Sequence, residues 1–255
     1  MQIFHEELWR GWENVRVSVT PSLTHEEADL GGVADDLARA ALAMARRFSR
    51  PGATLWCASS RWPFHARHVA VEFVHPVIVG KRALAALTVP SGADLVATLR
   101  ASVRPGDLVL ALSPAADAAV ADVMRRGQAW GVETIWVGAG PDRPPAGAAN
   151  HVLWLDTEDE LQASEQFVRL YHMLWELTHV CFEHPGLLKE TGECLDDVCI
   201  TCSDEGRLAE VVTVDTENDE AVVRTPDGRE RVDISLLDAP TPGDLILIHA
   251  GFAIR

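Results

Sequence analysis

The chain has 255 residues, of which 47% are hydrophobic and 24% are charged; this excludes a largely disordered chain and predicts one large domain or two unequal ones. Acidic residues outnumber basic ones by 38 to 22, a net charge of −16, which argues against binding to the phosphate backbone of nucleic acids. The N-terminus carries acidic side chains where a signal peptide carries basic ones, and no apolar stretch approaches the roughly 18 residues of a membrane span. We therefore expect a cytoplasmic protein that binds neither nucleic acid nor membrane.

Helical and strand patterns alternate through the first two thirds of the chain. Apolar residues recur at helical spacing from 29 to 48, and Pro51 and Gly52 end that helix. The further expected elements are strands over 53–58, 82–89, 107–112, 132–137 and 151–155, and helices over 64–74, 93–100, 115–130 and 159–182. This alternation predicts an α/β fold, with a parallel sheet covered by helices on both faces.

The pattern changes after Gly186. Four short strands are expected over 207–215, 220–225, 229–237 and 244–254, divided by turn signals, and they predict a small β-barrel of about 55 residues. The barrel segment is also the more acidic part, because residues 196–255 hold 14 acidic and 5 basic residues, whereas all eight Trp lie at or before Trp175. We therefore expect a domain over 1–183, a linker over 184–198 and a barrel over 199–255.

Four of the five cysteines fall close together around the expected linker. They are Cys181, Cys194, Cys199 and Cys202, and the last two form a C-x-x-C pair. Five cysteines are too few for a disulfide scaffold of this size, so the cluster indicates metal or thiol chemistry. A zinc site with four thiolates and simple burial of individual cysteines both remain open, since the spacing fits no familiar zinc module.

Two expected helices carry histidine next to a carboxylate. His65, His68 and Glu72 stand at i, i+3 and i+7, which places them within a narrow arc of one helix face. On the last helix, Glu176 follows His172 by one turn. Such pairs can chelate a divalent metal or divide the acid and base roles of a proton transfer, although surface or hydrogen-bonded core histidines are the alternative.

The order of elements gives these histidines a context. The segments CASSRWPFHARHVAVEF, GDLVLALSPAADAAVADVMRRGQAWGVETIWVGAG and EQFVRLYHMLWEL together resemble the sugar isomerase (SIS) fold, specifically phosphoheptose isomerases, over roughly residues 29–180. The resemblance implies that His68, Glu72 and His172 form a metal site, with zinc as one candidate, and that Glu72 and His172 act as base and acid in aldose/ketose interconversion of a sugar such as sedoheptulose 7-phosphate. A further ligand of that family falls on Ser164. The resemblance also implies a homo-oligomer, a dimer or a tetramer.

The loops that bind phosphate in that family are altered here. The first reads Cys57-Ala58-Ser59-Ser60-Arg61-Trp62 and the second Ser113-Pro114-Ala115-Ala116-Asp117. Pro114 lacks an amide donor, and Asp117 adds negative charge where phosphate would sit. Ser59, Ser60, Arg61 and Ser113 are the remaining candidate ligands, so a working isomerase, a domain with an altered ligand and a scaffold without chemistry all stay open.

The closing segment PGDLILIHAGFAI, with an upstream Cys-Ile, resembles the HypC/HupF family of [NiFe]-hydrogenase maturation chaperones over residues 199–254. The resemblance implies a small OB-like barrel in which Cys199 and His249 hold the iron that receives cyanide and carbon monoxide. In that family the cysteine follows the initiator Met, whereas Cys199 is internal here. Cys202 is therefore a second candidate thiolate for the iron.

These features lead to one leading hypothesis and two alternatives. The leading hypothesis is a [NiFe]-hydrogenase maturation factor whose barrel docks on a HypD-type protein, on the hydrogenase large subunit or on both, while the SIS-like domain oligomerises or binds a small ligand. The first alternative is a sugar-phosphate isomerase with a regulatory barrel. The second is a non-catalytic oligomeric adaptor.

Overall fold

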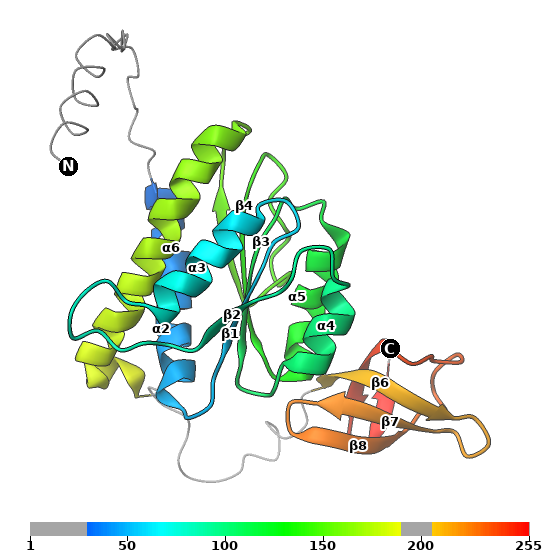
Figure 1. Ribbon diagram of the computed structural model, residues 1–255. Helices are drawn as coiled ribbons and strands as arrows, with labels where there is room; N and C mark the ends of the chain where they lie inside the picture. Colours follow the sequence, from blue (N-terminus) through cyan, green and yellow to red (C-terminus); the bar gives the residue numbers. More distant parts are fainter. Residues whose placement is uncertain (1–29, 190–205, 255) are drawn as a thin grey trace, which may run out of the picture.

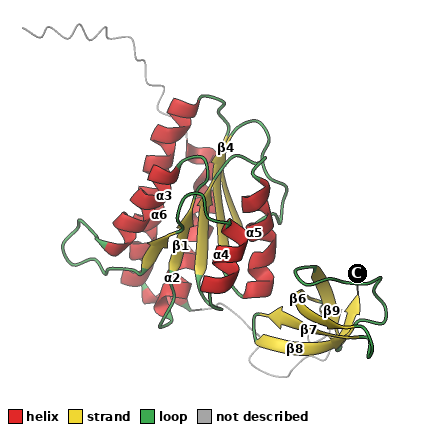
Figure 2. Cartoon of the chain, turned by 45° about the vertical axis from the view of Figure 1, so that its right-hand side comes forward, coloured by secondary structure: helices red, strands yellow, loops and turns green. Residues whose placement is uncertain are grey.

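The computed structural model describes residues 30–189 and 206–254, and the first of these ranges forms an α/β domain. Its five parallel strands are ordered β2-β1-β3-β4-β5 and form the larger yellow sheet of Figure 2. They are β1 (Leu55–Ala58), β2 (Ala86–Thr88), β3 (Leu108–Leu112), β4 (Glu133–Ala139) and β5 (His151–Leu155). The central strand β3 is buried throughout, as a strand covered on both faces must be. The predicted parallel sheet is confirmed.

Helices cover both faces of this sheet and enclose two separate apolar cores. One face carries α2 (Ala34–Ser49), α3 (Pro63–Val74) and α6 (Glu160–Glu183), and the other carries α4 (Leu95–Ser102) and α5 (Ala118–Trp130). Short 3-10 helices, η1 (Leu30–Val33) and η2 (Pro185–Leu188), precede α2 and follow α6. Within the described residues, no helix combines the length and the apolar character needed to cross a membrane.

Local sequence signals begin and end several of these helices. The carboxylates of Asp94, Asp117 and Asp159 accept hydrogen bonds from backbone amides in the first turns of α4, α5 and α6. Such N-caps satisfy amides that have no partner within the helix. At the other end of α5, Gly131 adopts the left-handed conformation at φ 69°, which glycine reaches without steric cost.

The chain leaves neighbouring strands toward opposite faces of the sheet. β1 and β3 pair directly, but β1 leads into α3 on one face and β3 into α5 on the other. In open α/β sheets, ligands bind in the crevice at the carboxyl ends of strands at such a switch point. The fold therefore places the loops after β1 and β3 at a position where a ligand would normally bind.

The second described range forms a closed barrel of five short strands with its own apolar core. The strand order is β10-β8-β7-β6-β9, and β9 closes the barrel by pairing with β10. The strands are β6 (Arg207–Asp215), β7 (Glu220–Thr225), β8 (Gly228–Asp233), β9 (Leu245–His249) and β10 (Phe252–Ile254). Along β7 buried residues alternate with more exposed ones, the pattern expected when one face of a strand lines a core. The predicted barrel is confirmed.

Two of the predicted barrel strands have different limits in the structure. The strand expected over 229–237 ends at Asp233, where Ile234 and Leu237 form a hydrogen-bonded turn instead. The strand expected over 244–254 is interrupted by Ala250 and Gly251, both at positive φ, and becomes the antiparallel pair β9 and β10. Positive φ at two successive residues is the geometry of a tight hairpin. The chain therefore reverses within the segment that was predicted to be one strand.

The barrel packs against α4 and α5 of the α/β domain (Figure 1). The Glu210 carboxylate on β6, only 3% exposed, accepts hydrogen bonds from Arg126 Nη1 at 2.7 Å, Arg100 Nε at 3.0 Å and Trp130 Nε1 at 2.9 Å. Leu208 and Leu245 of the barrel pack against the apolar core beneath α4 and α5. A buried carboxylate shared by two guanidinium groups and an indole thus links the two domains.

A smaller polar cluster joins β4 and β5 to α2, and from it we expect the stability of the protein to depend on pH. Glu133 accepts hydrogen bonds from Arg47 Nη2 and contacts His151 Nε2, both at 3.1 Å. The hydrogen bond to His151 is the largest cause lowering the pKa of Glu133, and Arg47 adds to it, whereas burial opposes both. A carboxyl group whose pKa is lower in the folded state stabilises the fold above its unfolded pKa, and this stabilisation is lost as pH falls through the folded pKa.

Replacing Glu133 by Gln should therefore lower the free energy of unfolding at neutral pH by about 1.5–3 kcal/mol, the range for a hydrogen bond to a charged group. The difference from the wild type should shrink as the pH falls through the folded pKa of Glu133. Urea denaturation over a pH series measures both quantities. The exposed Glu158→Gln is the control, and a Glu133→Gln effect of constant size at every pH would contradict the explanation.

Candidate metal centre

Three predicted side chains meet between α3 and α6. Glu72 Oε1 lies 3.2 Å from His68 Nε2, one turn away on α3, and 3.4 Å from His172 Nε2 on α6. One ligand atom from each residue can be chosen so that all three lie within 4.8 Å of one another. Because α3 and α6 pack over the same face of the sheet, the fold brings together residues that are 100 positions apart in the sequence.

Two further polar groups lie behind His68. The Tyr171 hydroxyl is 2.6 Å from His68 Nδ1, and His65 Nε2 is 2.9 Å from the Ser164 hydroxyl. Burial lowers the pKa of His65 to about 4, and the nearby His68 adds to the shift, so His65 is neutral at neutral pH. His65 lies on the predicted helix face but turns into the core. Tyr171 instead orients His68, as outer partners orient metal-binding imidazoles.

The remaining histidines of the two helices lie elsewhere. His179 is buried, and its ring nitrogens lie 2.9 Å from the carbonyl oxygens of Trp175 and Arg82. Glu176 is exposed, and His75 stands at the C-cap of α3. The carboxylate closest to His172 is therefore Glu72 from the other helix, and the pairing of His172 with Glu176 suggested by their spacing is not formed.

The donor set and its accessibility fit a divalent cation. Two imidazole nitrogens and a carboxylate oxygen are a common zinc ligand set that leaves a position for water or substrate. The side chains of His68 and His172 are 41% and 44% exposed, whereas that of Glu72 is 17% exposed. The group is thus open on the imidazole side. Without a metal, the same Glu72 and His172 are close enough to exchange a proton.

The predicted phosphate loops are occupied by contacts within the chain. The Ser59 hydroxyl donates to the Leu112 carbonyl at 2.6 Å, and Ser60 is hydrogen-bonded to Asp117. Arg61 forms an ion pair with Glu160 at 2.6 Å. Ser113 is completely buried and accepts a hydrogen bond from Trp136 Nε1 at 3.0 Å. The four candidate ligands lie near the switch point of the sheet, but their polar groups already contact the protein.

The barrel places His249 at the end of β9, directly before the tight turn to β10. His249 is half-buried and pairs across the hairpin with Phe252. Ala250 and Gly251 form the turn at φ 50° and 85°. The other two expected iron ligands, Cys199 and Cys202, lie outside the described residues, as does most of the expected linker over 184–198.

Sequence reasoning missed two groups that matter for these sites. Tyr171 directly precedes His172 in the sequence, so its hydroxyl could have been predicted to lie near the site. Glu210 gave no such signal, because it lies in a strand of otherwise alternating pattern and its partners Arg100 and Arg126 belong to the other domain. Contacts between domains leave no periodicity in either sequence segment.

Several solved structures are similar to part of this chain. A phosphoheptose isomerase from Francisella tularensis is 13% identical with a TM-score of 0.48, and the match covers 58% of this chain and 86% of that one. A phosphoheptose isomerase from Neisseria gonorrhoeae is 17% identical, with a TM-score of 0.47 and coverage of 57% and 86%. The sugar isomerase domain of a transcription factor from Sphaerobacter thermophilus is 21% identical, with a TM-score of 0.40 and coverage of 59% and 81%. No curated protein sequence matches the chain.

The barrel matches a known protein family by sequence. The model of the HupF/HypC family aligns with residues 208–255, which span from the first barrel strand past β10. This range contains His249 and the turn that follows it, and it begins after Cys199 and Cys202. The chain is therefore a fusion in which an α/β domain precedes a C-terminal HupF/HypC-family domain.

Proposed function

We propose that this chain is a maturation factor for [NiFe]-hydrogenase, in which the barrel handles the iron that carries cyanide and carbon monoxide. The observation that carries this proposal is the HupF/HypC family match over residues 208–255. His249 is half-buried at the end of β9, where it pairs with Phe252 across the tight hairpin. An imidazole fixed in this way can reach a metal bound outside the barrel.

The iron ligands in this proposal are His249 with Cys199, Cys202 or both. Thiolate and imidazole are suitable ligands for iron, and a thiol loses its proton when it binds a metal. Cys199 and Cys202 lie only a few residues before Arg207, where β6 begins. The iron is cargo here, since a maturation chaperone must release it to its partner.

The proposed partners follow from the family and from charge. We assign docking on a HypD-type protein, on the hydrogenase large subunit or on both to the acidic barrel domain. The α/β domain would then add oligomerisation or a divalent metal site, over the proposed limits 1–183.

Genetic complementation tests the proposed function. In a host that depends on this gene, the full chain should restore hydrogenase activity and the chain lacking residues 196–255 should not. Restoration by the shortened chain would refute it.

A second candidate function, sugar-phosphate isomerisation, is favoured by the group of His68, Glu72 and His172. In that reaction Glu72 would remove a proton next to the carbonyl and His172 would serve as the acid, while a bound metal would polarise the carbonyl. The contacts that occupy Ser60 and Arg61 weigh against phosphate binding. Turnover of sedoheptulose 7-phosphate that is abolished by Glu72→Gln would establish this function, and absence of turnover in the wild type would remove it.

Metal binding between α3 and α6 can be tested independently of either function. His68→Ala should weaken Zn²⁺ binding by at least about 100-fold, because loss of outer partners alone costs roughly 10–100-fold. Tyr171→Phe should cause a smaller loss, about tenfold, since it removes only the hydroxyl next to His68 Nδ1. Titration calorimetry with Zn²⁺ on the full chain measures both, with the exposed His75→Ala as the control. Equal affinity in His68→Ala and the wild type would exclude this site.

A further inference from the structure

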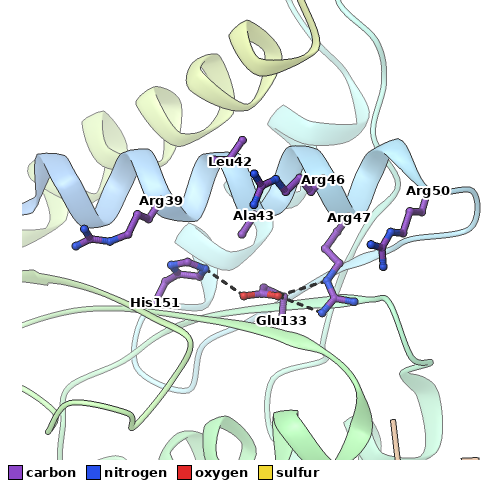
Figure 3. A pocket seen from close by; sticks show the side chains of 8 residues that line it. All are labelled: Arg39, Leu42, Ala43, Arg46, Arg47, Arg50, Glu133 and His151. Atoms are coloured by element: carbon purple, nitrogen blue, oxygen red, sulfur yellow. Dashed lines mark hydrogen bonds and ion pairs between the residues drawn. The ribbon is translucent and has the colours of Figure 1, made fainter. Parts of the chain in front are cut away.

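A basic cavity lies along α2. Arg39, Arg46, Arg47 and Arg50 line a cavity of about 400 Å³ whose walls also include Leu42, Ala43, Glu133 and His151 (Figure 3). The lining of this cavity therefore contains four arginines and one carboxylate, in a chain whose net charge is −16. We call these four arginines and their cavity the arginine groove.

One arginine of the groove, Arg46, has no carboxylate partner among the described residues. Glu133 already binds Arg47 and His151, and Arg39 forms an ion pair with Asp36 at 2.7 Å. Arg46 contacts only carbonyl oxygens among the described residues, those of Leu187 at 3.5 Å and Lys189 at 3.4 Å, and its Nε is buried without a hydrogen-bond partner there. A partly buried guanidinium without an anion is unfavourable, so the groove should attract an acidic group.

The groove continues toward the barrel. A second cavity of about 680 Å³ shares Arg47 and Arg50 with the first and adds Arg104. It follows the amino ends of the strands, and its lining extends to Pro226 in the turn between β7 and β8. Basic side chains thus accompany an open path from the C-terminal end of the α/β domain to the barrel.

The segment that connects the two described ranges has the complementary charge. Residues 190–205 contain six carboxylates and no Lys or Arg; the acidic positions are Glu190, Glu193, Asp196, Asp197, Asp204 and Glu205. The segment follows Lys189, whose carbonyl oxygen contacts Arg46 in the groove, and it precedes Gly206, which lies against Leu247 of the barrel. The described residues on either side of the segment therefore lie near the two ends of the basic path, since Arg207 forms an ion pair with Asp227, the neighbour of Pro226.

We propose that the acidic segment 190–205 of the same chain docks in the arginine groove. Arg39 and Arg50 are eleven positions apart along α2 and its C-cap, about 16 Å at 1.5 Å per residue, which suits an extended acidic peptide better than one compact anion. Covalent attachment at both ends gives the segment a high effective concentration at the groove. Docking would define the path of the chain that carries Cys199 and Cys202. The proposal does not depend on the hydrogenase function.

Zero-length cross-linking tests this docking, because the chain has only two lysines, Lys81 and Lys189. In the full-length variants Arg46→Lys and Arg50→Lys, a carbodiimide should link the new amine to Asp196, Asp197, Asp204 or Glu205, as identified by peptide mass spectrometry. The variants keep the positive charge, so the groove should still attract the segment. The links should be lost in about 1 M salt, where the screening length is only about 3 Å.

The matched control is Arg143→Lys, an exposed position that contacts Asp36 at 3.0 Å outside the groove. It should link to Asp36 and not to residues 196–205. A mixture of isotopically light and heavy chains separates links within one chain from links between two copies. Links no more frequent than in Arg143→Lys would overturn the proposal. Links only between light and heavy chains would overturn it too, because the occupant would then be a second copy.

Discussion

Replacing Cys199 and Cys202 together by alanine should reduce hydrogenase activity in a dependent host to that of the strain lacking the gene. His249→Ala should have the same result. In the proposed function these side chains hold the iron, and removal of a metal ligand costs more than the roughly 10–100-fold caused by loss of an outer partner. The assay is hydrogenase activity in extracts, with immunoblots showing equal amounts of each variant.

Matched substitutions separate loss of ligands from loss of fold. Cys194→Ala removes a thiol of the same segment that lies before the C-x-x-C pair, and His75→Ala removes an exposed imidazole of the other domain. Both should leave activity unchanged. Single replacement of Cys199 and of Cys202 then shows which thiol is needed. Full activity in the double cysteine variant or in His249→Ala would refute the assignment of iron to these residues.

Replacing Glu210 by alanine should destabilise the protein by about 3–5 kcal/mol, the cost of removing one partner of a buried ion pair. The change leaves the guanidinium groups of Arg100 and Arg126 without their shared carboxylate and the Trp130 indole without its acceptor. Urea denaturation of the full chain measures the loss. Because the contact joins two domains, the barrel and the α/β domain should also unfold in separate transitions in Glu210→Ala.

Two further variants make this result specific. Glu210→Gln keeps an acceptor for Trp130 but loses the charge, so its loss of stability should be intermediate. Glu217→Ala removes an exposed carboxylate after the end of β6 and should change the free energy of unfolding by less than about 0.5 kcal/mol. A wild-type-like unfolding curve for Glu210→Ala would show that this carboxylate does not hold the domains together.

Most of the fold could be predicted because it depends on residues that are close together in the sequence. The helices of the α/β domain end within a few residues of their predicted limits, since Asp caps, glycine and proline act on neighbouring backbone. The apolar runs of β3 and β4 identify central strands without knowledge of their partners. The split between β9 and β10 was missed because Ala250 adopts positive φ, a conformation that is uncommon for alanine.

The candidate site was predicted only in part, because its members come from separate elements. Helical spacing placed His68 beside Glu72, but it also suggested Glu176 as the partner of His172, and only the packing of α6 on α3 replaces that carboxylate by Glu72. Tyr171 contacts His68 for the same reason. The loops after β1 and β3 follow neighbouring strands of the sheet, but their internal hydrogen bonds depend on distant side chains and could not be predicted.

The central claim, that this fusion handles iron for hydrogenase maturation, is tested most directly by infrared spectroscopy of the full chain. The protein would be purified without oxygen from a host that expresses the other maturation proteins. The account predicts bound iron together with the absorption of cyanide and carbon monoxide ligands in the wild type, and loss of both in the variant lacking Cys199, Cys202 and His249. A wild-type protein without iron and without these absorptions, or a variant that retains them, would contradict it.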